Sequence, residues 1–169
     1  MPQLLENQTV AADLSARFGD FITDVHEPYN LLTLTTTREK ILEVLEYLRD
    51  HAEFRFTFLT TMCGVHYPDS PGAELCMVYM MHSLETNTRV RIKIFFPSAD
   101  PIVPTATNLF ACANWMEREA WDFFGIVFSG HPNLIRILNM EDMDYFPMRK
   151  EYTLEDPTRR DKIDAKFGR

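Results

Sequence analysis

The spacing of apolar residues in the first third of the chain predicts two helices and two short strands. Apolar side chains recur with a helical period over residues 4–18 and again over residues 38–50, where Thr37 can cap the helix. Between them, residues 21–26 and 31–36 are typical of strands, the second because of its many β-branched residues. This part is therefore expected to run helix, strand, strand, helix.

Three longer extended segments follow, over residues 54–65, 74–83 and 89–96. The last alternates strictly, so its apolar residues fall on one face of a strand and its basic residues mostly on the other. Only residues 84–88 separate it from the preceding segment, which is short enough for a hairpin. The middle of the chain therefore predicts a sheet.

A second long helix is expected after a proline-rich stretch that interrupts regular structure. Thr105 or Thr107 can cap this helix, which should end near Phe124. The interrupting residues are Pro97, Pro101 and Pro104.

Helical spacing divides the side chains of this second helix into faces. Arg118 and Asp122 lie four residues apart, so a weak ion pair between them is expected. The core face is expected to hold Leu109, Cys112, Met116, Ala120 and Phe123. Large aromatic side chains that a helix does not need for its core commonly anchor protein interfaces. Those outside the core face here are Phe110, Trp115 and Trp121.

Together these elements predict an α+β domain with a mixed or largely antiparallel sheet and helices packed on one face. We place the domain at residues 1–139 and an extended, partner-binding C-terminal arm at residues 140–169. From Glu141 to Arg169, 15 of 29 residues are charged, so this segment cannot bury enough apolar surface to fold alone. We expect the arm to be disordered or to wrap around another protein.

The net charge of the chain limits the kinds of molecule that it can bind. Seventeen basic and 25 acidic residues give the 169-residue chain a net charge of −8, which argues against sequence-independent binding to nucleic acid. No segment approaches the roughly 18 uncharged apolar residues of a membrane span, and residues 1–8 do not resemble a signal peptide. A role at a membrane would therefore need a partner that carries the chain there.

The sequence contains no typical motif for a metal cluster, a nucleotide or a catalytic nucleophile. Cys63, Cys76 and Cys112 are too far apart for a typical zinc or iron–sulfur site, so buried or reduced thiols are expected and no cluster. No glycine-rich nucleotide loop and no serine nucleophile motif is present.

The densest mixture of charged and aromatic residues runs from Glu117 to Phe124 and ends at a glycine. Three interpretations are open. Glu119, Asp122 and His131 could bind a metal for hydrolysis, although no ligand pair such as His-x-x-x-His supports this. The charges could instead form a solvated helix face. The third interpretation, an interface for another subunit, is favoured because aromatics, arginine–carboxylate sets and the charged arm occur together.

Residues 117–152 resemble the 30-kilodalton subunit family of respiratory complex I, the C subunits of NADH-quinone oxidoreductase. The resemblance rests on Glu117-Arg118-Glu119-x-x-Asp122-x-Phe124-Gly125-Ile126-x-Phe128-x-Gly130-His131-Pro132-Asn133-Leu134 and on Pro147-Met148-Arg149-Lys150-Glu151-Tyr152. Departures at Ile135, at Tyr145-Phe146 and at Glu151 affect only the expected contacts of the arm. The signature and interface residues it implies are Glu117, Arg118, Glu119, Trp121, Asp122, Phe124, Gly125, Gly130, His131, Pro132, Arg136, Pro147, Arg149 and Lys150.

The resemblance implies a non-catalytic scaffold subunit in the peripheral arm of a proton-translocating NADH:quinone oxidoreductase. Flavin, iron–sulfur clusters and quinone would be held by other subunits and none by this chain. The implied partners are the 49-kilodalton-type (D) subunit and the cluster-bearing B and I subunits, on the cytoplasmic face of the inner (plasma) membrane. The alternative is an equivalent subunit of a related membrane-bound hydrogenase-type complex.

This family interpretation assigns expected roles to the motif. The polar set at the helix end would be completed by contacts within the motif and across the interface, so loss of Glu119 or Asp122 should loosen assembly. Gly125 and Gly130 would allow the turns that bring His131 and the following proline back to the helix. The arm would order only on binding. The donors expected to serve carboxylates of the motif or of the partner are Arg136, Arg149 and Lys150.

Overall fold

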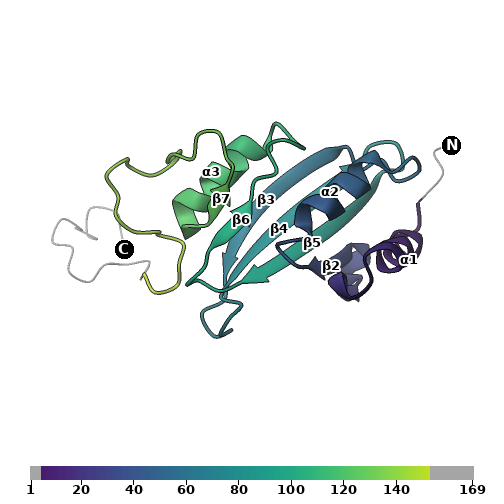
Figure 1. The fold of residues 1–169 in the computed structure, drawn as a ribbon, viewed down its shortest axis with the longest axis horizontal. Helices are drawn as coiled ribbons and strands as arrows, with labels where there is room; N and C mark the ends of the chain where they lie inside the picture. The colour runs from purple at the N-terminus through teal and green to yellow at the C-terminus, as the bar shows by residue number, and fades with distance from the viewer. Residues whose placement is uncertain (1–4, 153–169) are drawn as a thin grey trace, which may run out of the picture.

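The computed structural model describes residues 5–152, and residues 1–4 and 153–169 lie outside the described part of the chain (Figure 1). The helices are α1 (Asn7–Phe18), α2 (Ile41–Asp50) and α3 (Ala113–Phe124). The strands are β1 (Thr23–His26), β2 (Leu32–Thr36), β3 (Phe58–His66), β4 (Leu75–Ser83), β5 (Thr88–Phe96), β6 (Ile102–Pro104) and β7 (Val127–Ser129). Single 3₁₀ turns, Gly19–Phe21 and Pro28–Asn30, flank β1.

Five strands form one mixed sheet in the order β1-β2-β5-β4-β3. β2 and β5 are parallel, whereas the other neighbours are antiparallel. β4 and β5 form the predicted hairpin, in which Tyr79 is paired with Ile92 and Met77 with Ile94. This topology confirms the predicted α+β fold with a mixed sheet.

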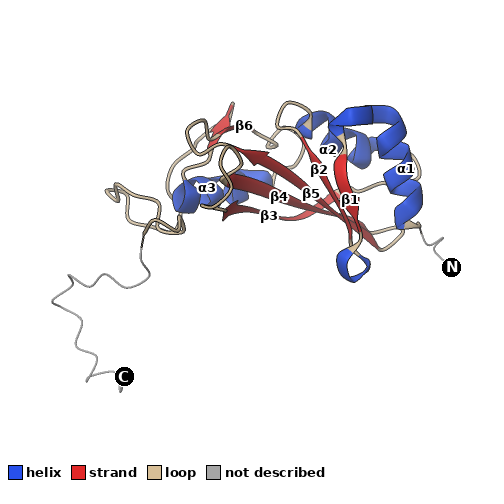
Figure 2. Ribbon diagram, turned by 90° about the horizontal axis from the view of Figure 1, so that it is seen from below, coloured by secondary structure: helices blue, strands red, loops and turns tan. Residues whose placement is uncertain are grey.

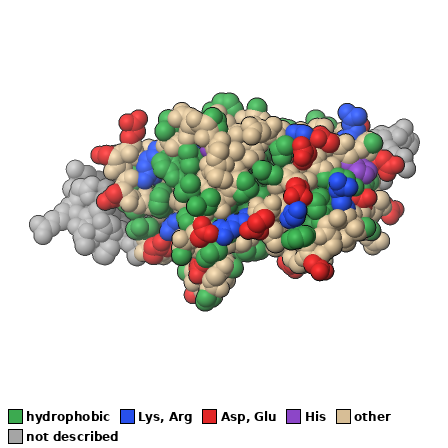
Figure 3. Space-filling view, in the orientation of Figure 1, with side chains coloured by type: hydrophobic (Ala, Val, Ile, Leu, Met, Phe, Trp, Pro, Cys, Tyr) green, Lys and Arg blue, Asp and Glu red, His purple; other side chains and the backbone are tan. Residues whose placement is uncertain are grey.

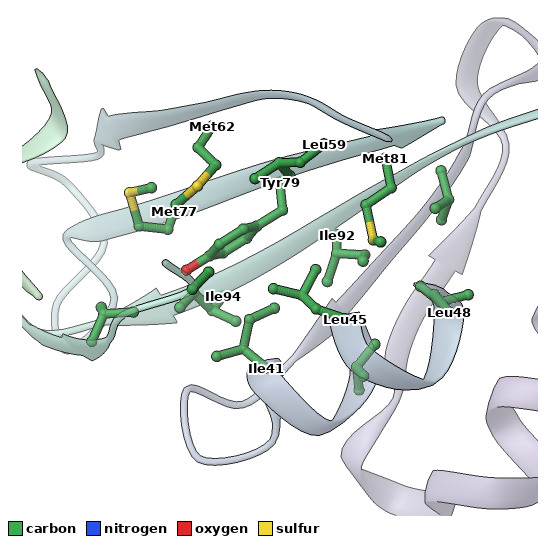
Figure 4. Packing of buried hydrophobic residues seen from close by; sticks show 14 of the residues in the cluster. Ile41, Leu45, Leu48, Leu59, Met62, Met77, Tyr79, Met81, Ile92 and Ile94 are labelled. Carbon is green, nitrogen blue, oxygen red and sulfur yellow. The ribbon is translucent and has the colours of Figure 1, made fainter. Parts of the chain in front are cut away.

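One face of the sheet carries the core. Strand β5 alternates as predicted, and its fully or almost fully buried positions are Val90, Ile92, Ile94 and Phe96. In Figure 4, Ile41 and Leu45 of α2 lie against Ile92 and Ile94, with Tyr79 of β4 beside them. Burial of these side chains supplies the main driving force that holds α2 on the sheet.

Helix α3 covers the same face beside the edge strand β3. The approach is close because Gly64 has no side chain, and a Cβ there would lie 2.6 Å from the ring of Phe124. Gly64 shares its face of β3 with the buried Met62. Figure 2 shows α2 lying over the same side of the sheet. The prediction that helices pack on one face is therefore confirmed.

The beginning of α3 differs from the prediction. The helix begins at Ala113 and not near Thr105 or Thr107, because the chain over residues 107–112 forms turns. Phe110, which was expected outside the core, is only 6% exposed and belongs to it. The proline-rich stretch also contains β6, which pairs in parallel with β7. Strands of three residues are too short to give a periodic sequence signal.

Helix α2 also begins later than predicted, at Ile41, and Thr37 makes no side-chain cap. Arg38, the expected first helical residue, instead turns toward Asp100 and donates a hydrogen bond of 2.6 Å to its carboxylate. This long-range contact fastens the start of α2 to the loop before β6.

Candidate functional site

A buried carboxylate organises the segment that follows α3. Asp122 is fully buried, and its Oδ1 accepts hydrogen bonds from Arg136 Nη1 at 2.6 Å and Asn139 Nδ2 at 3.0 Å. Its Oδ2 accepts the backbone N–H groups of Ile137, Leu138 and Asn139 at 3.1, 2.8 and 2.9 Å. One side chain of the helix therefore holds residues 136–139 against α3.

The electrostatics of Asp122 agree with this role. Burial alone would raise its pKa, but hydrogen bonds from Asn139, Leu138 and Arg136 outweigh that effect and hold the pKa well below its usual range. Arg136 is itself only 8% exposed in its side chain, lies over the ring of Trp121, and also donates to the carbonyls of Met143 and Tyr145. The carboxylate and guanidinium thus form a nearly dry, fully bonded pair.

Arg118 fastens the same segment from a second point on the helix. Its Nε donates to the carbonyl of Ile135 at 3.0 Å and its Nη2 to the carbonyl of Arg136 at 2.9 Å. The predicted ion pair between Arg118 and Asp122 is therefore wrong. Both side chains bind the returning chain instead, because its backbone N–H and C=O groups need partners next to the helix.

His131 closes the turn between β7 and this segment. Its Nδ1 accepts the N–H of Asn133 at 3.0 Å, so its Nε2–H donates to the carbonyl of Asn114 at 3.1 Å. Gly130 adopts a φ of +84° and Pro132 is exposed. The expected return of His131 toward the helix is therefore present, through a backbone carbonyl of α3.

Residues 146–150 form a second fastening at the C-terminal end of α3. The N–H of Met148 donates to the carbonyl of Phe123 at 3.1 Å, and Arg149 Nε donates to the carbonyl of Phe124 at 2.7 Å. These carbonyls belong to the last turn of the helix, where a cation is favourable. The N–H of Lys150 donates to His66 Nδ1 at 2.9 Å. Pro147, which is partly buried, begins this docked stretch.

Glu117 is the second buried carboxylate of α3, but its partners lie in the chain before the helix, whereas those of Asp122 lie after it. It accepts hydrogen bonds of 2.6 Å from the hydroxyl of Thr105 and from the N–H of Ala106. This contact fixes the entry to the helix. Burial raises the pKa of Glu117 to about 7, although the two hydrogen bonds oppose the rise.

We expect Glu117 to make stability depend on pH. The unfolded chain keeps the ordinary pKa of 4.5, so the folded chain binds an extra proton between pH 4.5 and about 7. The stabilisation is complete below pH 4.5 and is lost as the pH rises through 7. The wild type should therefore lose about 2–3 kcal/mol relative to Glu117→Gln between pH 5 and pH 8. Urea unfolding of both proteins measures this, and parallel pH profiles would refute it.

The structure thus separates the predicted residues into three groups. Those whose polar groups are bonded within the chain are Glu117, Arg118, Asp122, His131, Arg136 and Arg149. Phe124 and Gly125 are buried, and Trp121 is partly buried. Glu119 and Trp115 point outward, Trp115 with 56% of its surface exposed. The contacts expected within the motif are therefore present at most of these charges, whereas the side chains of Glu119 and Lys150 have none within residues 5–152, and the contacts expected across an interface stay a prediction.

Several residues that complete the site carry no local sequence signal. Thr105, Asn139 and His66 act through contacts with residues far along the chain, and Gly64 acts through the space it leaves for Phe124. Thr105 was expected only as a helix cap and not as the partner of Glu117, and nothing near Asn139, His66 or Gly64 distinguishes them from ordinary loop or strand residues.

The internal bonding leaves an outer surface rich in apolar side chains on the segment after α3, which curves around the end of that helix (Figure 1). We call it the outer strip. Its exposed apolar residues are Ile135 (50%), Leu138 (63%), Met140 (68%), Tyr145 (39%), Met148 (51%) and Tyr152 (42%), and the exposed acidic residues Glu141, Asp142 and Asp144 lie among them in the sequence. Apolar side chains gathered on one ordered loop are typical of a surface that a second protein covers.

The geometry does not assemble a hydrolase site from the three candidate ligands. The carboxylate of Asp122 is occupied by five donors, His131 is bonded through both ring nitrogens, and Glu119 lies on the surface. Among residues 5–152, no group of three or more His, Cys, Asp or Glu side chains could hold a metal ion. Over the same residues, no helix is both long and apolar enough to span a bilayer.

Comparison with known sequences gives consistent matches. A sequence model of the family described as "Respiratory-chain NADH dehydrogenase, 30 Kd subunit" matches residues 34–158. The NADH-quinone oxidoreductase C subunit numbered 2 in Rhizobium etli is 42% identical over 144 residues, which cover 85% of this chain and 75% of that protein. The corresponding C subunit of Citrifermentans bemidjiense is 39% identical over 92% of this chain and 95% of its own length. That of Mycobacterium ulcerans is 42% identical, over 58% of its length.

Solved structures are also similar. The trypsin-resistant fragment (1–134) of Nqo5 superposes with a TM-score of 0.64 at 29% identity, over 77% of this chain and all of that one. A chain of the membrane-bound sulfane sulfur reductase, an archaeal respiratory membrane complex, superposes with a TM-score of 0.75 over 89% of this chain and 87% of its own. At 19% identity, the second likeness shows a shared fold alone.

Proposed function

This chain belongs to the family of the 30-kilodalton subunit of respiratory-chain NADH dehydrogenase, and we propose that it is a non-catalytic scaffold subunit of an NADH:quinone oxidoreductase. In this role it helps to assemble the peripheral arm of the complex. Electrons pass from NADH through flavin and iron–sulfur clusters of other subunits to quinone, coupled to proton translocation. The chain works at the cytoplasmic face of the plasma membrane, where its partners hold it.

The outer strip is the observation that carries this proposal. Asp122, Arg118 and Arg149 hold residues 135–150 in one conformation, so the apolar side chains of the strip are presented without a large ordering cost on binding. A preorganised apolar surface with aromatic members suits a permanent interface between subunits. We assign it to the 49-kilodalton-type (D) subunit, with the B and I subunits as further neighbours of the arm.

The family signature therefore has an indirect part in assembly. Its buried charges position the strip, whereas Trp115 and Glu119 of α3 are exposed. Gly125 and residues 146–150 fix the C-terminal end of the outer strip. These contacts explain why a signature rich in charge can serve an interface whose contact surface is apolar.

We expect a charge placed in the outer strip to impair assembly without unfolding the chain. Leu138→Glu should lower the amount of assembled NADH:quinone oxidoreductase in membranes at least fivefold, because a carboxylate would be buried at the interface without a partner. Leu84→Glu is the matched control, since Leu84 is 66% exposed in the β4–β5 hairpin and Leu138 is 63% exposed.

Blue-native electrophoresis and NADH:quinone turnover of membranes measure the effect. Equal complex content in the Leu138→Glu strain, the Leu84→Glu strain and the wild type would count against the strip as the docking surface. The urea unfolding midpoints of the purified chains should agree within the small range of ordinary surface substitutions.

A further inference from the structure

The face of the five-stranded sheet opposite the helices has a composition unlike that of a solvent-facing sheet. We call it the open face, because α2 and α3 both pack on the other side. The exposed or partly exposed residues that alternate onto it from β3, β4 and β5 are Phe58, Thr61, Cys63, Val65, Val78, Met80, Arg89, Arg91, Lys93 and Phe95. Sheets with one wet face normally place polar residues there, whereas half of these residues are apolar.

The strand register brings the basic and apolar side chains of the open face together. Arg91 is paired across the sheet with Met80, and Lys93 with Val78. Cys63 pairs with Val78 on the following strand and so borders the basic residues from the edge strand β3. Burial and then the charge of Glu119 in α3 raise the pKa of its thiol, and the charge of Arg91 opposes them. The open face is therefore a stripe of cations bordered by apolar side chains.

The cations of the open face have no carboxylate partner in the described part of the chain. Within residues 5–152, no carboxylate lies within 4.0 Å of Arg89, Arg91 or Lys93. On the helix-bearing side, Arg38 and Lys40 are paired with acidic residues, and Figure 3 shows basic and acidic side chains lying next to one another there. In a chain with a net charge of −8, the open face thus gathers three cations of one strand without a carboxylate partner among residues 5–152.

One end of the open face is hollowed. A cavity of about 670 Å³ opens there, lined by Met80, Arg89, residues 5–8 of the N-terminal region and the loop before β2, and its lining includes the carboxylates Glu6 and Glu27. This hollow can receive a side chain of a docked segment, while the flat part of the face offers the cations.

We propose that the open face is a second docking surface, which binds an acidic amphipathic segment of another subunit of the complex. Carboxylates of that segment pair with Arg91 and Lys93, and its apolar side chains cover Val78, Met80 and Phe95. Charge complementarity selects this occupant, because unpaired cations beside apolar side chains match a surface that alternates carboxylates with apolar residues. The proposal rests on the proposed function, since it needs the chain to lie inside an assembly, but it uses a face separate from the outer strip.

Cys63 provides a direct test, because it is the exposed cysteine on the open face, whereas Cys76 is buried. Alkylation by N-ethylmaleimide is followed by mass spectrometry in the detergent-solubilised complex and in the purified full chain. We expect Cys63 to react at least tenfold more slowly in the complex. Equal rates in both samples would overturn the proposal.

The identity of the occupant is tested with a thiol-to-carboxylate cross-linker anchored at Cys63. Links to an acidic peptide of a different subunit support the proposal. Links only to a second copy of this chain, or protection that disappears when bound lipid is removed with the subunits still present, overturn it.

Charge reversal separates this inference from the proposed function. Arg91→Glu should lower the amount of assembled complex at least threefold. Arg55→Glu is the control, because the Arg55 side chain is 52% exposed and lies outside β5, and it should leave the amount of complex unchanged. Loss of assembly in Leu138→Glu with normal assembly in Arg91→Glu would overturn the second docking surface and leave the proposed function standing. Normal assembly in both the Leu138→Glu and the Arg91→Glu variants would contradict both docking surfaces.

Discussion

Asp122→Asn is expected to destabilise the isolated chain by about 3–5 kcal/mol, the cost of leaving a buried arginine without its carboxylate. Arg136 has an 8% exposed side chain and would keep its charge in a site that no longer neutralises it. The amide nitrogen would also face the N–H groups of residues 137–139, which now donate to Oδ2. Urea unfolding at pH 7 measures the loss.

Glu119→Gln is the matched control for this change, because Glu119 lies three residues earlier in the same helix and is exposed. Its substitution should change stability by less than about 0.5 kcal/mol. Similar losses in the two variants would mean that the buried bonding of Asp122 is not what stabilises the segment. The sequence pattern assigns these two carboxylates the same role, and the structure separates them.

Gly125→Ala is expected to cost about 2–5 kcal/mol. Gly125 ends α3 with a φ of +71°, a left-handed conformation that costs a residue with a Cβ about 1–2 kcal/mol. An added Cβ would also lie 2.5 Å from the ring of Phe146, so the ring must move, at about 1–3 kcal/mol. Movement of Phe146 would strain the neighbouring hydrogen bond from Arg149 to the carbonyl of Phe124.

Gly72→Ala is the control that separates the backbone cost of this change from its steric cost. Gly72 has a φ of +81°, but nothing lies within 4 Å of the position of an added Cβ. It should therefore show the backbone cost alone, about 1–2 kcal/mol. Unfolding midpoints of both variants in urea give the comparison, and equal losses would show that contact with Phe146 does not limit residue 125.

The fold was predictable where the sequence repeats a short period over many residues. The strict alternation in β5 and the helical periods of α1 and α2 indicated the correct element types, because burial on one face imposes the period. The start of α3 was not predictable, since it depends on Glu117 reaching back to Thr105 and Ala106. Strands β6 and β7 are too short to show a period.

For the candidate site, the sequence located the right stretch but not its bonding. The mixture of charge and aromatic residues between Glu117 and Phe124 marked a region with demanding contacts. Spacing along a helix, however, compares neighbours within that helix, and so it paired Arg118 with Asp122. The actual partners, Arg136 and Asn139, are brought back by the turn after β7, which no local pattern specifies. The domain boundary at residue 139 stays a prediction, although Met148 and Arg149 contact α3 from beyond it.

Amide hydrogen exchange of Ile137, Leu138 and Asn139 tests the central claim most directly, that the signature folds the segment onto α3 within this chain and thereby prepares the outer strip. In the purified full chain without partners, all three amides should exchange far more slowly than exposed loop amides, because Asp122 accepts them in a buried site. Protection should then be lost in Asp122→Asn. Rapid exchange in the free wild-type chain, with protection only in the assembled complex, would contradict the account.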